Sequence, residues 1–319
     1  MKAIVLTEAG GVDNLVLQEI PTPAITDNEV LVKVKAISIN PVEATIRKNR
    51  DFLHLVLGIR DGEQPIILGW DVSGVVEQTG KAVTRFKKGD EVFGMVNFIG
   101  HGKAYAEYVA APEPHLALKP ANISHEEAAA GALAALTAWQ TLVHYANIQA
   151  GHRVLIHSAA GGVGHYAVQI AKHLGAYVIG TASAANRDFV LGLGAGEHID
   201  YSKHRFEDLV KDADIVVDSV WKEGHLERSL QSLKRRGKLI SLVMFPDERV
   251  SRIALMSRKF LYRMEVASDE QDIDTISGLL AKGYIRSHIS HKFRFDEIDK
   301  AHLQVESGHT RGKIVVVVD

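Results

Sequence analysis

The residues best suited to carry chemistry form a glycine-rich turn, Ala159-Ala160-Gly161-Gly162-Val163-Gly164, with the spacing A-x-G-x-x-G. An apolar run at 154–156 precedes it and indicates a short buried parallel strand. A helical pattern ending near Gly175 follows, and a second apolar run at 177–179 completes a strand–helix–strand unit. In such a unit Gly161 lets the backbone approach a pyrophosphate, and Gly164 lets the helix pack closely on the strand. The free N–H groups at the helix start favour phosphate. The segment predicts a dinucleotide site that includes Ser158, Ala160, Gly161, Gly162, Val163 and Gly164. The alternative is a turn that only packs.

The residues after the second strand favour NADP over NAD. An Asp or Glu about 20 residues past the motif is typical of NAD sites, where it binds the ribose 2′-hydroxyl. Here the sequence reads Thr-Ala-Ser-Ala-Ala-Asn-Arg from residue 181, with no acid before Asp188. Ser183 can donate a hydrogen bond to a 2′-phosphate, Arg187 can pair with it, and Tyr201 after the next strand offers another hydroxyl. For Arg187 alone, a solvated charge at a helix start is an equal alternative.

Composition excludes several other classes of protein. A chain of 319 residues is longer than a single hydrophobic core usually supports, which suggests two domains. A net charge of −2 with 24% charged residues shows no basic field for nucleic acid or a membrane surface. No apolar run reaches the roughly 18 residues that a membrane helix needs, and the first residues lack a signal-peptide pattern. We therefore expect a cytoplasmic protein.

Strands and helices that position the turn can be read along the chain. Short strands are predicted at 1–6, 15–20 and 29–39, within 66–96 and at 105–110, with a short helix at 42–47 and a loop at 51–65. Ser124 and Glu127 form a capping box before an Ala-rich helical region, and a second helix includes residues 137–145. Further strands are expected at 197–200, 214–218, 238–244 and 261–266, with a helix at 226–235. The tail is predicted to hold helices at 269–282 and 295–306 and strands at 291–295 and 313–318, and to fold back onto the first domain.

The chain resembles the medium-chain dehydrogenase/reductase family, and within it the zinc-independent quinone oxidoreductases of the zeta-crystallin-like branch. The residues that carry the resemblance are 38–43 (SINPVE), 69–74 (GWDVSG), 89–92 (GDEV), 136–138 (LTA), 158–164 and 312–315 (GKIV). The resemblance implies an α/β protein with a GroES-like β-barrel catalytic domain and a Rossmann domain with a doubly wound parallel sheet. The expected bounds are 1–122 with 268–319 for the catalytic domain and 123–267 for the NADP-binding domain. It also implies NADP(H) in a cleft between them and a homodimer paired through the cofactor sheets.

The same resemblance assigns roles to individual residues. Asn40 would lie beside the nicotinamide ribose or the substrate and stabilise a developing oxyanion. A strand-end Asn that caps the turn before Pro41 is the alternative. Thr137 would lie near the carboxamide. Many relatives have a tyrosine in the short helix after Asn40; here Thr45 occupies that region, which leaves the general acid unassigned, with Glu43 or water as substitutes. The strand ends at Ser219, Val220, Leu242 and Met244 are expected to line the cofactor site.

A metal site is not expected. The chain has no cysteine, which removes the cysteine-based zinc sites of the zinc-dependent relatives, and most of its 16 histidines, His225 among them, stand singly. Without a metal, hydride transfer requires an electron-poor acceptor, such as a quinone or an α,β-unsaturated carbonyl. Two alternatives remain: a zinc-independent alcohol or ketone dehydrogenase, and an NADPH-binding redox sensor or structural protein with little turnover.

Overall fold

The computed structural model describes residues 1–60 and 62–318, so residues 61 and 319 of the predicted ranges 51–65 and 268–319 lie outside it. The chain divides into two compact units after Leu136 and after Val266. Unit 1 contains the N-terminal part and the segment that begins at Ala267, and unit 2 spans Thr137–Val266. The first division lies later than the expected boundary at residue 122, because the helix α3 (His125–Ala130) packs on strands of unit 1.

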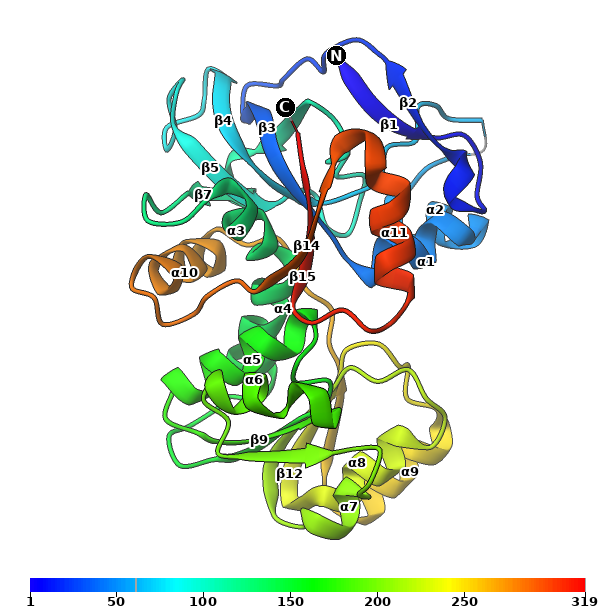
Figure 1. The fold of residues 1–319 in the computed structure, drawn as a ribbon, viewed down its shortest axis with the longest axis vertical. Helices are drawn as coiled ribbons and strands as arrows, with labels where there is room; N and C mark the ends of the chain where they lie inside the picture. The colour runs from blue at the N-terminus through cyan, green and yellow to red at the C-terminus, as the bar shows by residue number, and fades with distance from the viewer. Residues whose placement is uncertain (61, 319) are drawn as a thin grey trace. The chain divides into compact units, whose positions relative to one another are not determined.

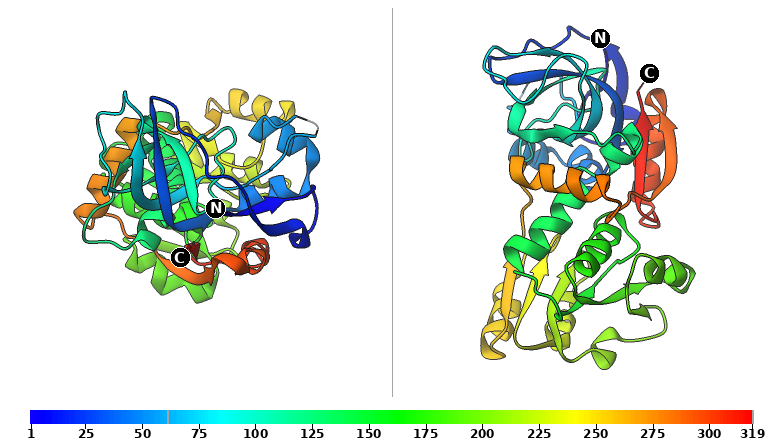
Figure 2. Two further views of the ribbon diagram at one scale, coloured as in Figure 1. Left: turned by 90° about the horizontal axis from the view of Figure 1, so that it is seen from above. Right: turned by 90° about the vertical axis from the view of Figure 1, so that its left-hand side faces the viewer.

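Unit 1 is built on β-strands. A seven-stranded sheet has the order β14-β15-β3-β4-β5-β7, with β6 paired to β3, and β1 and β2 form a separate antiparallel pair. The C-terminal strand β15 pairs with β3, so segments from both ends of the chain lie side by side (Figure 1, Figure 2). The bounds are β1 Lys2–Leu6, β2 Leu15–Glu19, β3 Glu29–Ile39, β4 Asp71–Thr79, β5 Glu91–Met95, β6 Tyr108–Pro112, β7 Leu116–Leu118, β14 Ile289–Arg294 and β15 Lys313–Val317.

The predicted loop at 51–65 is wrong in its first half, where the chain forms the helix α2 (Arg50–Leu57). The side chain of Asn49 caps this helix by accepting hydrogen bonds from the N–H groups of Asp51 and Phe52 at 2.9 and 3.3 Å. Gly58 ends it with φ +69°. Leu53 and Leu57, four residues apart, are its buried face. The other helices of unit 1 are α1 Pro41–Lys48, α10 Glu270–Ala281 and α11 Ile298–Glu306.

Unit 2 contains a parallel six-stranded sheet in the order β10-β9-β8-β11-β12-β13. This is the doubly wound order, in which the direction of winding reverses between β8 and β11. Helices α5 and α6 cover one face, and α7, α8 and α9 lie on the other (Figure 1). The bounds are β8 Arg153–Ile156, α5 Gly162–His173, β9 Tyr177–Ala182, α6 Arg187–Gly192, β10 Glu197–Asp200, α7 Phe206–Leu209, β11 Ala213–Asp218, α8 His225–Ser232, β12 Leu233–Ser241, α9 Glu248–Met256 and β13 Phe260–Arg263.

Two helical predictions needed correction. The helix predicted at 226–235 ends at Ser232, because Leu233 already begins β12. The helix predicted at 137–145 is the end of α4 (Leu133–Gln140) followed by a π-helix at Thr141–Tyr145. Short 3₁₀ turns occur at Val12–Asn14, Glu113–His115, Ala184–Asn186 and Phe295–Glu297. Among the described residues, no helix has the length and apolar character to cross a membrane.

Candidate functional site

The glycine-rich turn joins β8 to α5 as predicted. Ser158 has φ +50°, and its carbonyl oxygen accepts a hydrogen bond from the N–H of Gly161 at 2.8 Å. The backbone N–H of Ala159 donates to the carbonyl oxygen of Thr181 on β9 at 2.9 Å. Gly161 precedes the twelve-residue helix α5 in the N-cap position and has no side chain to bond its N–H groups. Free N–H groups therefore face the carboxyl edge of the sheet, where a phosphate would bind.

Close packing at Gly164 shows why the motif needs glycine there. A Cβ at this position would lie 2.1 Å from the carbonyl oxygen of Ser158 and 2.8 Å from the Cα of Ala159. Both neighbours are backbone atoms that cannot turn aside. At Gly161 a Cβ would lie 3.2 Å from the same oxygen, so the fold can accommodate a small side chain at this position. The turn thus fits a dinucleotide. Gly164 lets the helix pack closely on the strand, and Gly161 and Gly162 place no side chain over the N–H groups at the start of the helix.

The residues expected to hold a 2′-phosphate follow β9 and β10. Ser183 is half-buried and accepts a hydrogen bond from the Nδ2 of Asn186 at 3.3 Å, which leaves its own hydrogen free to donate. Arg187 is exposed and pairs with the neighbouring Asp188 at 2.9 Å. Tyr201 is 60% exposed, and its N–H donates to the carbonyl oxygen of Ala182 at 3.4 Å, so it lies beside the end of β9.

Lys203 is a further cation of this region that sequence reasoning missed. A surface hollow is lined by residues 201–205 and by Arg228 of α8. Arg205 and Arg228 both bind the carboxylate of Glu207. Across residues 1–60 and 62–318, the ammonium group of Lys203 makes no ion pair. The signal in the sequence is the basic run Lys203-His204-Arg205, which begins two residues after Tyr201.

The strand ends after β11 and β12 lie at the same edge of the sheet. Ser219 donates its hydroxyl hydrogen to the carbonyl oxygen of His157 at 3.3 Å, and the N–H of Val220 donates to Asp218 Oδ1 at 3.0 Å. The N–H of Leu242 donates to the carbonyl oxygen of Asp218 at 2.8 Å, and the carbonyl oxygen of Met244 accepts from Ser241 at 2.7 Å. All four predicted residues are half-buried. These contacts tie Ser219 to His157, which directly precedes the glycine-rich turn, and they place Val220 and Leu242 beside Asp218.

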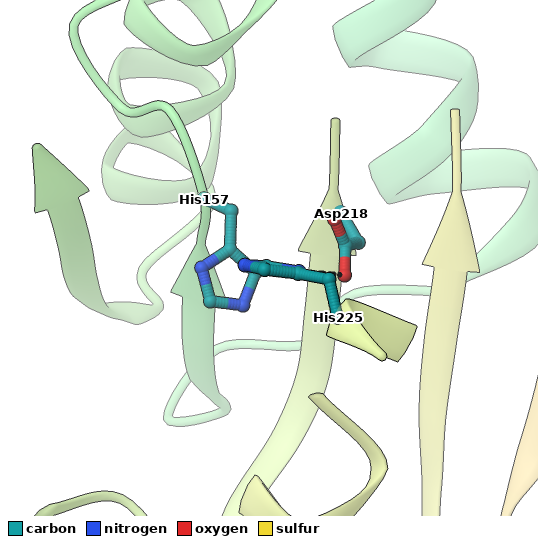
Figure 3. A group of neighbouring side chains, drawn as sticks. All are labelled: His157, Asp218 and His225. Atoms are coloured by element: carbon teal, nitrogen blue, oxygen red, sulfur yellow. Dashed lines mark hydrogen bonds and ion pairs between the residues drawn. The ribbon is translucent and has the colours of Figure 1, made fainter. Parts of the chain in front are cut away.

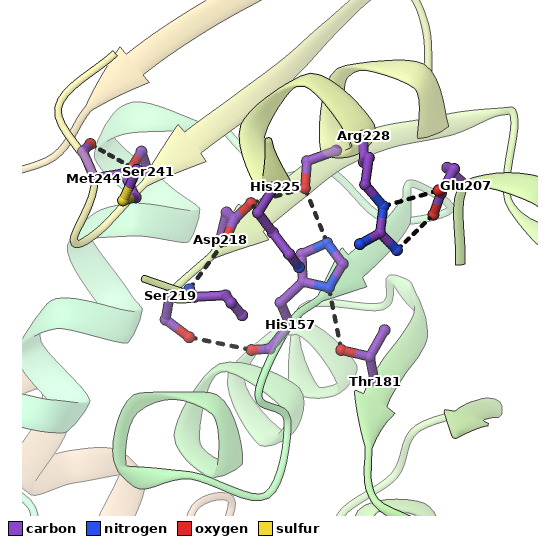
Figure 4. Close-up of polar contacts among 11 residues, drawn as sticks. His157, Thr181, Glu207, Asp218, Ser219, His225, Arg228, Ser241 and Met244 are labelled. Atoms are coloured by element: carbon purple, nitrogen blue, oxygen red, sulfur yellow. Dashed lines mark hydrogen bonds and ion pairs between the residues drawn. The ribbon is translucent and has the colours of Figure 1, made fainter. Parts of the chain in front are cut away.

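A buried polar network lies beneath this edge, and it corrects the expectation that His225 stands alone (Figure 3). His225 Nδ1 lies 2.8 Å from Asp218 Oδ2, and Ser229 donates to the same oxygen at 2.7 Å. Because Ser229 has only one hydroxyl hydrogen, His157 Nε2, which lies 3.1 Å from it, must be the donor in that contact. His157 Nδ1 then accepts from the hydroxyl of Thr181 at 3.1 Å (Figure 4).

Electrostatics agree with this hydrogen-bond pattern. Burial lowers the pKa of His157 to about 4, so the ring is neutral at physiological pH. Burial acts to raise the pKa of Asp218, but hydrogen bonds from His225 and Ser229 and the two nearby histidines lower it overall. Asp218 is therefore an ionised acceptor that ties β11 to α8.

Metal binding is the other chemistry that this cluster offers. The ligand atoms of His157, Asp218 and His225 lie within 4.8 Å of one another. However, both ring nitrogens of His157 and both oxygens of Asp218 already have protein partners, and the ring of Phe206 packs against His157 at 4.3 Å between centroids. We therefore interpret the cluster as a positioning network. Pairing of β8 with β11 places His157 next to Asp218, and the sequence has no signal for this long-range contact.

In unit 1, Asn40 belongs to a second buried cluster. Its Nδ2 donates to Glu43 Oε1 at 3.2 Å and to Asp71 Oδ2 at 2.9 Å, and its Oδ1 accepts from the ammonium group of Lys313. Glu43 also accepts from the backbone N–H of Asn40 at 2.8 Å, and Asp71 accepts from the N–H of Leu133 at 2.7 Å. Both amide hydrogens of Asn40 are committed, so the expectation that it donates directly to a reacting oxygen lacks support; its alternative as a turn-capping residue agrees with these contacts.

Burial dominates the charges of this cluster. It raises the pKa of Glu43 to about 8, with nearby Asp71 adding to the shift. It raises the pKa of Asp71 to about 6 against the opposing effects of Lys313 and Asn40. Burial also lowers the pKa of Lys313. When the two carboxyl groups share one proton, their single negative charge balances the ammonium group and the cluster is neutral. A neutral cluster has the lowest free energy away from water.

Thr45 and Thr137 are not brought into either cluster. Thr45 is exposed on α1 and donates its hydroxyl hydrogen to the carbonyl oxygen of Pro41 at 3.0 Å, one helical turn earlier. That contact occupies the proton which a general acid would have to deliver. Thr137 is buried in α4, four residues before the π-helix. π-Helical turns are frequent near functional sites.

A doubly wound parallel sheet with a glycine-rich turn at its switch point, joined to a separate β-rich unit, is typical of a dinucleotide-binding protein of two units. Comparison with known proteins agrees. Residues 26–121 match the alcohol dehydrogenase GroES-like domain, and residues 193–316 match the zinc-binding dehydrogenase domain.

Relatives and solved structures are similar over nearly the whole chain. An NADPH-dependent alkenal/one oxidoreductase of Arabidopsis thaliana is 34% identical over 99% of this chain and 79% of its own. A quinone-oxidoreductase homologue of Spinacia oleracea is 33% identical over 96% and 95%. The quinone oxidoreductase of Coxiella burnetii has a TM-score of 0.92 at 34% identity and covers 100% of this chain and 99% of its own. That of Escherichia coli, solved with NADPH, has a TM-score of 0.86 at 28% identity over 100% of both chains. The chain belongs to the quinone oxidoreductase family of medium-chain dehydrogenases/reductases, and its fold is the expected pair of a GroES-like domain and a Rossmann domain.

Proposed function

We propose that this protein uses NADPH to reduce a quinone or an α,β-unsaturated carbonyl compound without a catalytic metal. The observation that carries the proposal is the turn of unit 2, where Gly164 excludes a Cβ and the start of α5 offers bare N–H groups. Such a cradle fits a pyrophosphate. The named activities of the relatives support the acceptor class, since they include alkenal, quinone and 2-methylene-furan-3-one reductases.

The bound cofactor supplies a hydride, and the chain supplies position. Ser158 to Gly164 would hold the pyrophosphate, and Ser219, Val220, Leu242 and Met244 would flank it at the same sheet edge. Ser183, Tyr201, Arg187 and Lys203 would hold the 2′-phosphate. Among residues 1–60 and 62–318 Lys203 forms no ion pair, although its charge helps to lower the pKa of Asp200, whereas Arg187 is paired with Asp188. Asn40 would act through the buried cluster that fixes α1, not by direct contact.

Cofactor choice is tested by titrating the protein with NADPH and NADH and following cofactor fluorescence. We expect NADPH to bind at least about tenfold more tightly, because a charge-assisted contact contributes about 1.5–3 kcal/mol. Lys203→Ala and Ser183→Ala should remove most of that margin and leave NADH binding unchanged. Arg187→Ala is the matched charge control and should have a smaller effect. Equal binding of both cofactors by the wild type would show that the 2′-phosphate site is misassigned.

Acceptor class is tested by NADPH oxidation with a 2-alkenal, the matching saturated alkanal and a benzoquinone, each with and without a chelator. Turnover of the alkenal or quinone, none of the alkanal, and no effect of chelator are the expected results. Turnover of the alkanal would favour the alcohol or ketone dehydrogenase. NADPH binding without turnover of any acceptor would favour the redox sensor or structural protein.

We further propose a homodimer formed by unit 2. The strand β13 is the last strand of its sheet, and Phe260 on it is 43% exposed; Leu255 and Met256 at the end of α9 are 77% and 79% exposed. An open edge with apolar side chains is suited to pairing with a second copy. The cytoplasmic location stays a prediction, since named relatives include chloroplast and mitochondrial proteins.

Sedimentation equilibrium tests the dimer. Phe260→Glu should shift the protein from dimer to monomer by placing a charge in the interface. Leu118→Glu, at a 53% exposed position on the edge strand β7 of unit 1, should leave the mass unchanged. A monomeric wild type would rule the proposal out.

A further inference from the structure

Trp221 has the most exposed aromatic side chain among the described residues, ahead of Phe245 and Tyr201. It is 74% exposed, whereas Trp70 is fully buried. An indole has a large flat apolar face and a polar N–H, which suits it to contact a flat ligand ring. Trp221 follows β11 at the carboxyl edge of the unit 2 sheet, three residues after Asp218.

The backbone that carries Trp221 is fixed on both sides. Before it, the N–H of Val220 donates to Asp218 Oδ1 at 3.0 Å, and the hydroxyl of Ser219 donates to the carbonyl oxygen of His157 at 3.3 Å. After it, the N–H of Lys222 donates to the carbonyl oxygen of Val220 at 3.2 Å, and the N–H of His225 donates to the carbonyl oxygen of Lys222 at 3.1 Å. The positioning network therefore holds this segment in place (Figure 4). The exposed indole therefore belongs to a loop whose backbone is held by hydrogen bonds on both sides of Trp221.

The loop that carries Trp221 lies near the residues proposed to hold the 2′-phosphate, which belongs to the adenosine half of NADPH. Arg228, on the helix α8 that follows the loop, borders the hollow lined by Tyr201 and the residues after β10. Because the sheet is parallel, the loops after β10 and β11 both follow carboxyl ends of strands, and the helix that follows the second loop borders the hollow beside the first. If the 2′-phosphate binds at Ser183, Tyr201 and Lys203, the adenine base on the same ribose extends from that place toward the sheet edge that Trp221 occupies.

We propose that Trp221 stacks on the adenine ring of the cofactor and thereby contributes to its affinity. This inference rests on the proposed function, because it takes the 2′-phosphate site as given. A purine offers a flat π-face that an exposed indole can cover with little loss of side-chain freedom. The sequence signal is a Trp directly after the strand-end residues Ser219 and Val220.

The experiment compares NADPH affinity in the wild type, Trp221→Ala and Trp221→Phe, measured by cofactor fluorescence in the full chain. Loss of an aromatic stack should weaken NADPH binding about tenfold or more in the Ala variant, and Phe should restore most of it. Reduced nicotinamide mononucleotide, which lacks adenine, should bind the wild type and Trp221→Ala equally. Tyr177→Ala is the control, since this 41% exposed aromatic residue begins β9 at the opposite edge of the sheet.

Each outcome has a distinct meaning. NADPH binding that is equal in wild type and Trp221→Ala would overturn the stacking role and leave the proposed function intact. An equal loss for NADPH and for the adenine-free mononucleotide would also overturn it, because the residue would then act on the shape of the whole site. Absence of NADPH binding by the wild type would instead refute the proposed function, and with it this inference.

Discussion

Replacing Lys313 with methionine is expected to lower the free energy of unfolding by about 3–5 kcal/mol, the cost of breaking a buried ion pair. Lys313 is 3% exposed on β15; its ammonium group binds Asn40 Oδ1 and lies 3.8 Å from Asp71 Oδ2. Methionine fills a similar volume but leaves Glu43 and Asp71 without a counter-charge in the interior. Chemical denaturation at pH 7 measures the loss.

A control variant and the pH dependence distinguish the loss of the buried charge from a general loss of packing. Lys292 on the neighbouring strand β14 pairs with Glu126 at 3.0 Å, but its side chain is 56% exposed, so Lys292→Met should cost less than about 1 kcal/mol. A carboxyl group with a higher pKa in the folded than in the unfolded chain stabilises the fold at low pH and ceases to do so as the pH rises. Without Lys313 the pKa of Asp71 should exceed its value of about 6, so the deficit should be larger at pH 8 than at pH 5. A deficit independent of pH would show that lost packing, not lost charge, is the cause.

Replacing Gly164 with alanine is expected to destabilise the protein without cofactor by at least about 1–3 kcal/mol and to abolish measurable NADPH binding. The added Cβ would lie 2.1 Å from the carbonyl oxygen of Ser158. Relief requires α5 to move away from the turn, which would shift the N–H groups that receive the pyrophosphate. Thermal unfolding and NADPH titration measure the two effects.

Gly161→Ala provides the comparison within the same turn. Its φ is −83° and its nearest neighbour would be 3.2 Å from a Cβ, so the chain should fold with nearly wild-type stability. NADPH binding should still weaken, since a methyl group would stand where the pyrophosphate approaches. If Gly161→Ala binds NADPH normally, the turn does not hold the cofactor in the proposed way.

Elements with a local signature could be predicted from the sequence. The strand–turn–helix–strand segment from Arg153 to Ala182 needs only apolar periodicity and glycine spacing, and the capping box of Ser124 and Glu127 begins α3 as expected. Helix α2 has weak signals, because the cap at Asn49 and the terminating Gly58 lie among mixed residues without an extended apolar period. The helical pattern at 226–235 continues past Ser232, because Leu233 fits a helical face as well as a strand.

Contacts between distant segments could not be predicted in this way. The hydrogen bonds of Asn40 to Glu43 are local and visible in the sequence, but those to Asp71 and Lys313 bridge 31 and 273 residues. His157, Asp218 and His225 meet only because β8 and β11 are neighbours in the sheet. Such placements depend on strand order, which no spacing within one sequence reveals.

The position of β15 inside its sheet, next to β3, has a consequence for synthesis on the ribosome. β15 lies between β14 and β3, so residues from 313 onward complete a sheet begun by the first forty residues. Unit 2, by contrast, is continuous and can fold once Val266 has emerged. The nascent chain must therefore carry an incomplete first sheet, unpaired by β15 at residues 36–39 of β3, throughout the synthesis of unit 2. That interval is when an exposed strand edge is most prone to aggregation and when chaperones have most to protect.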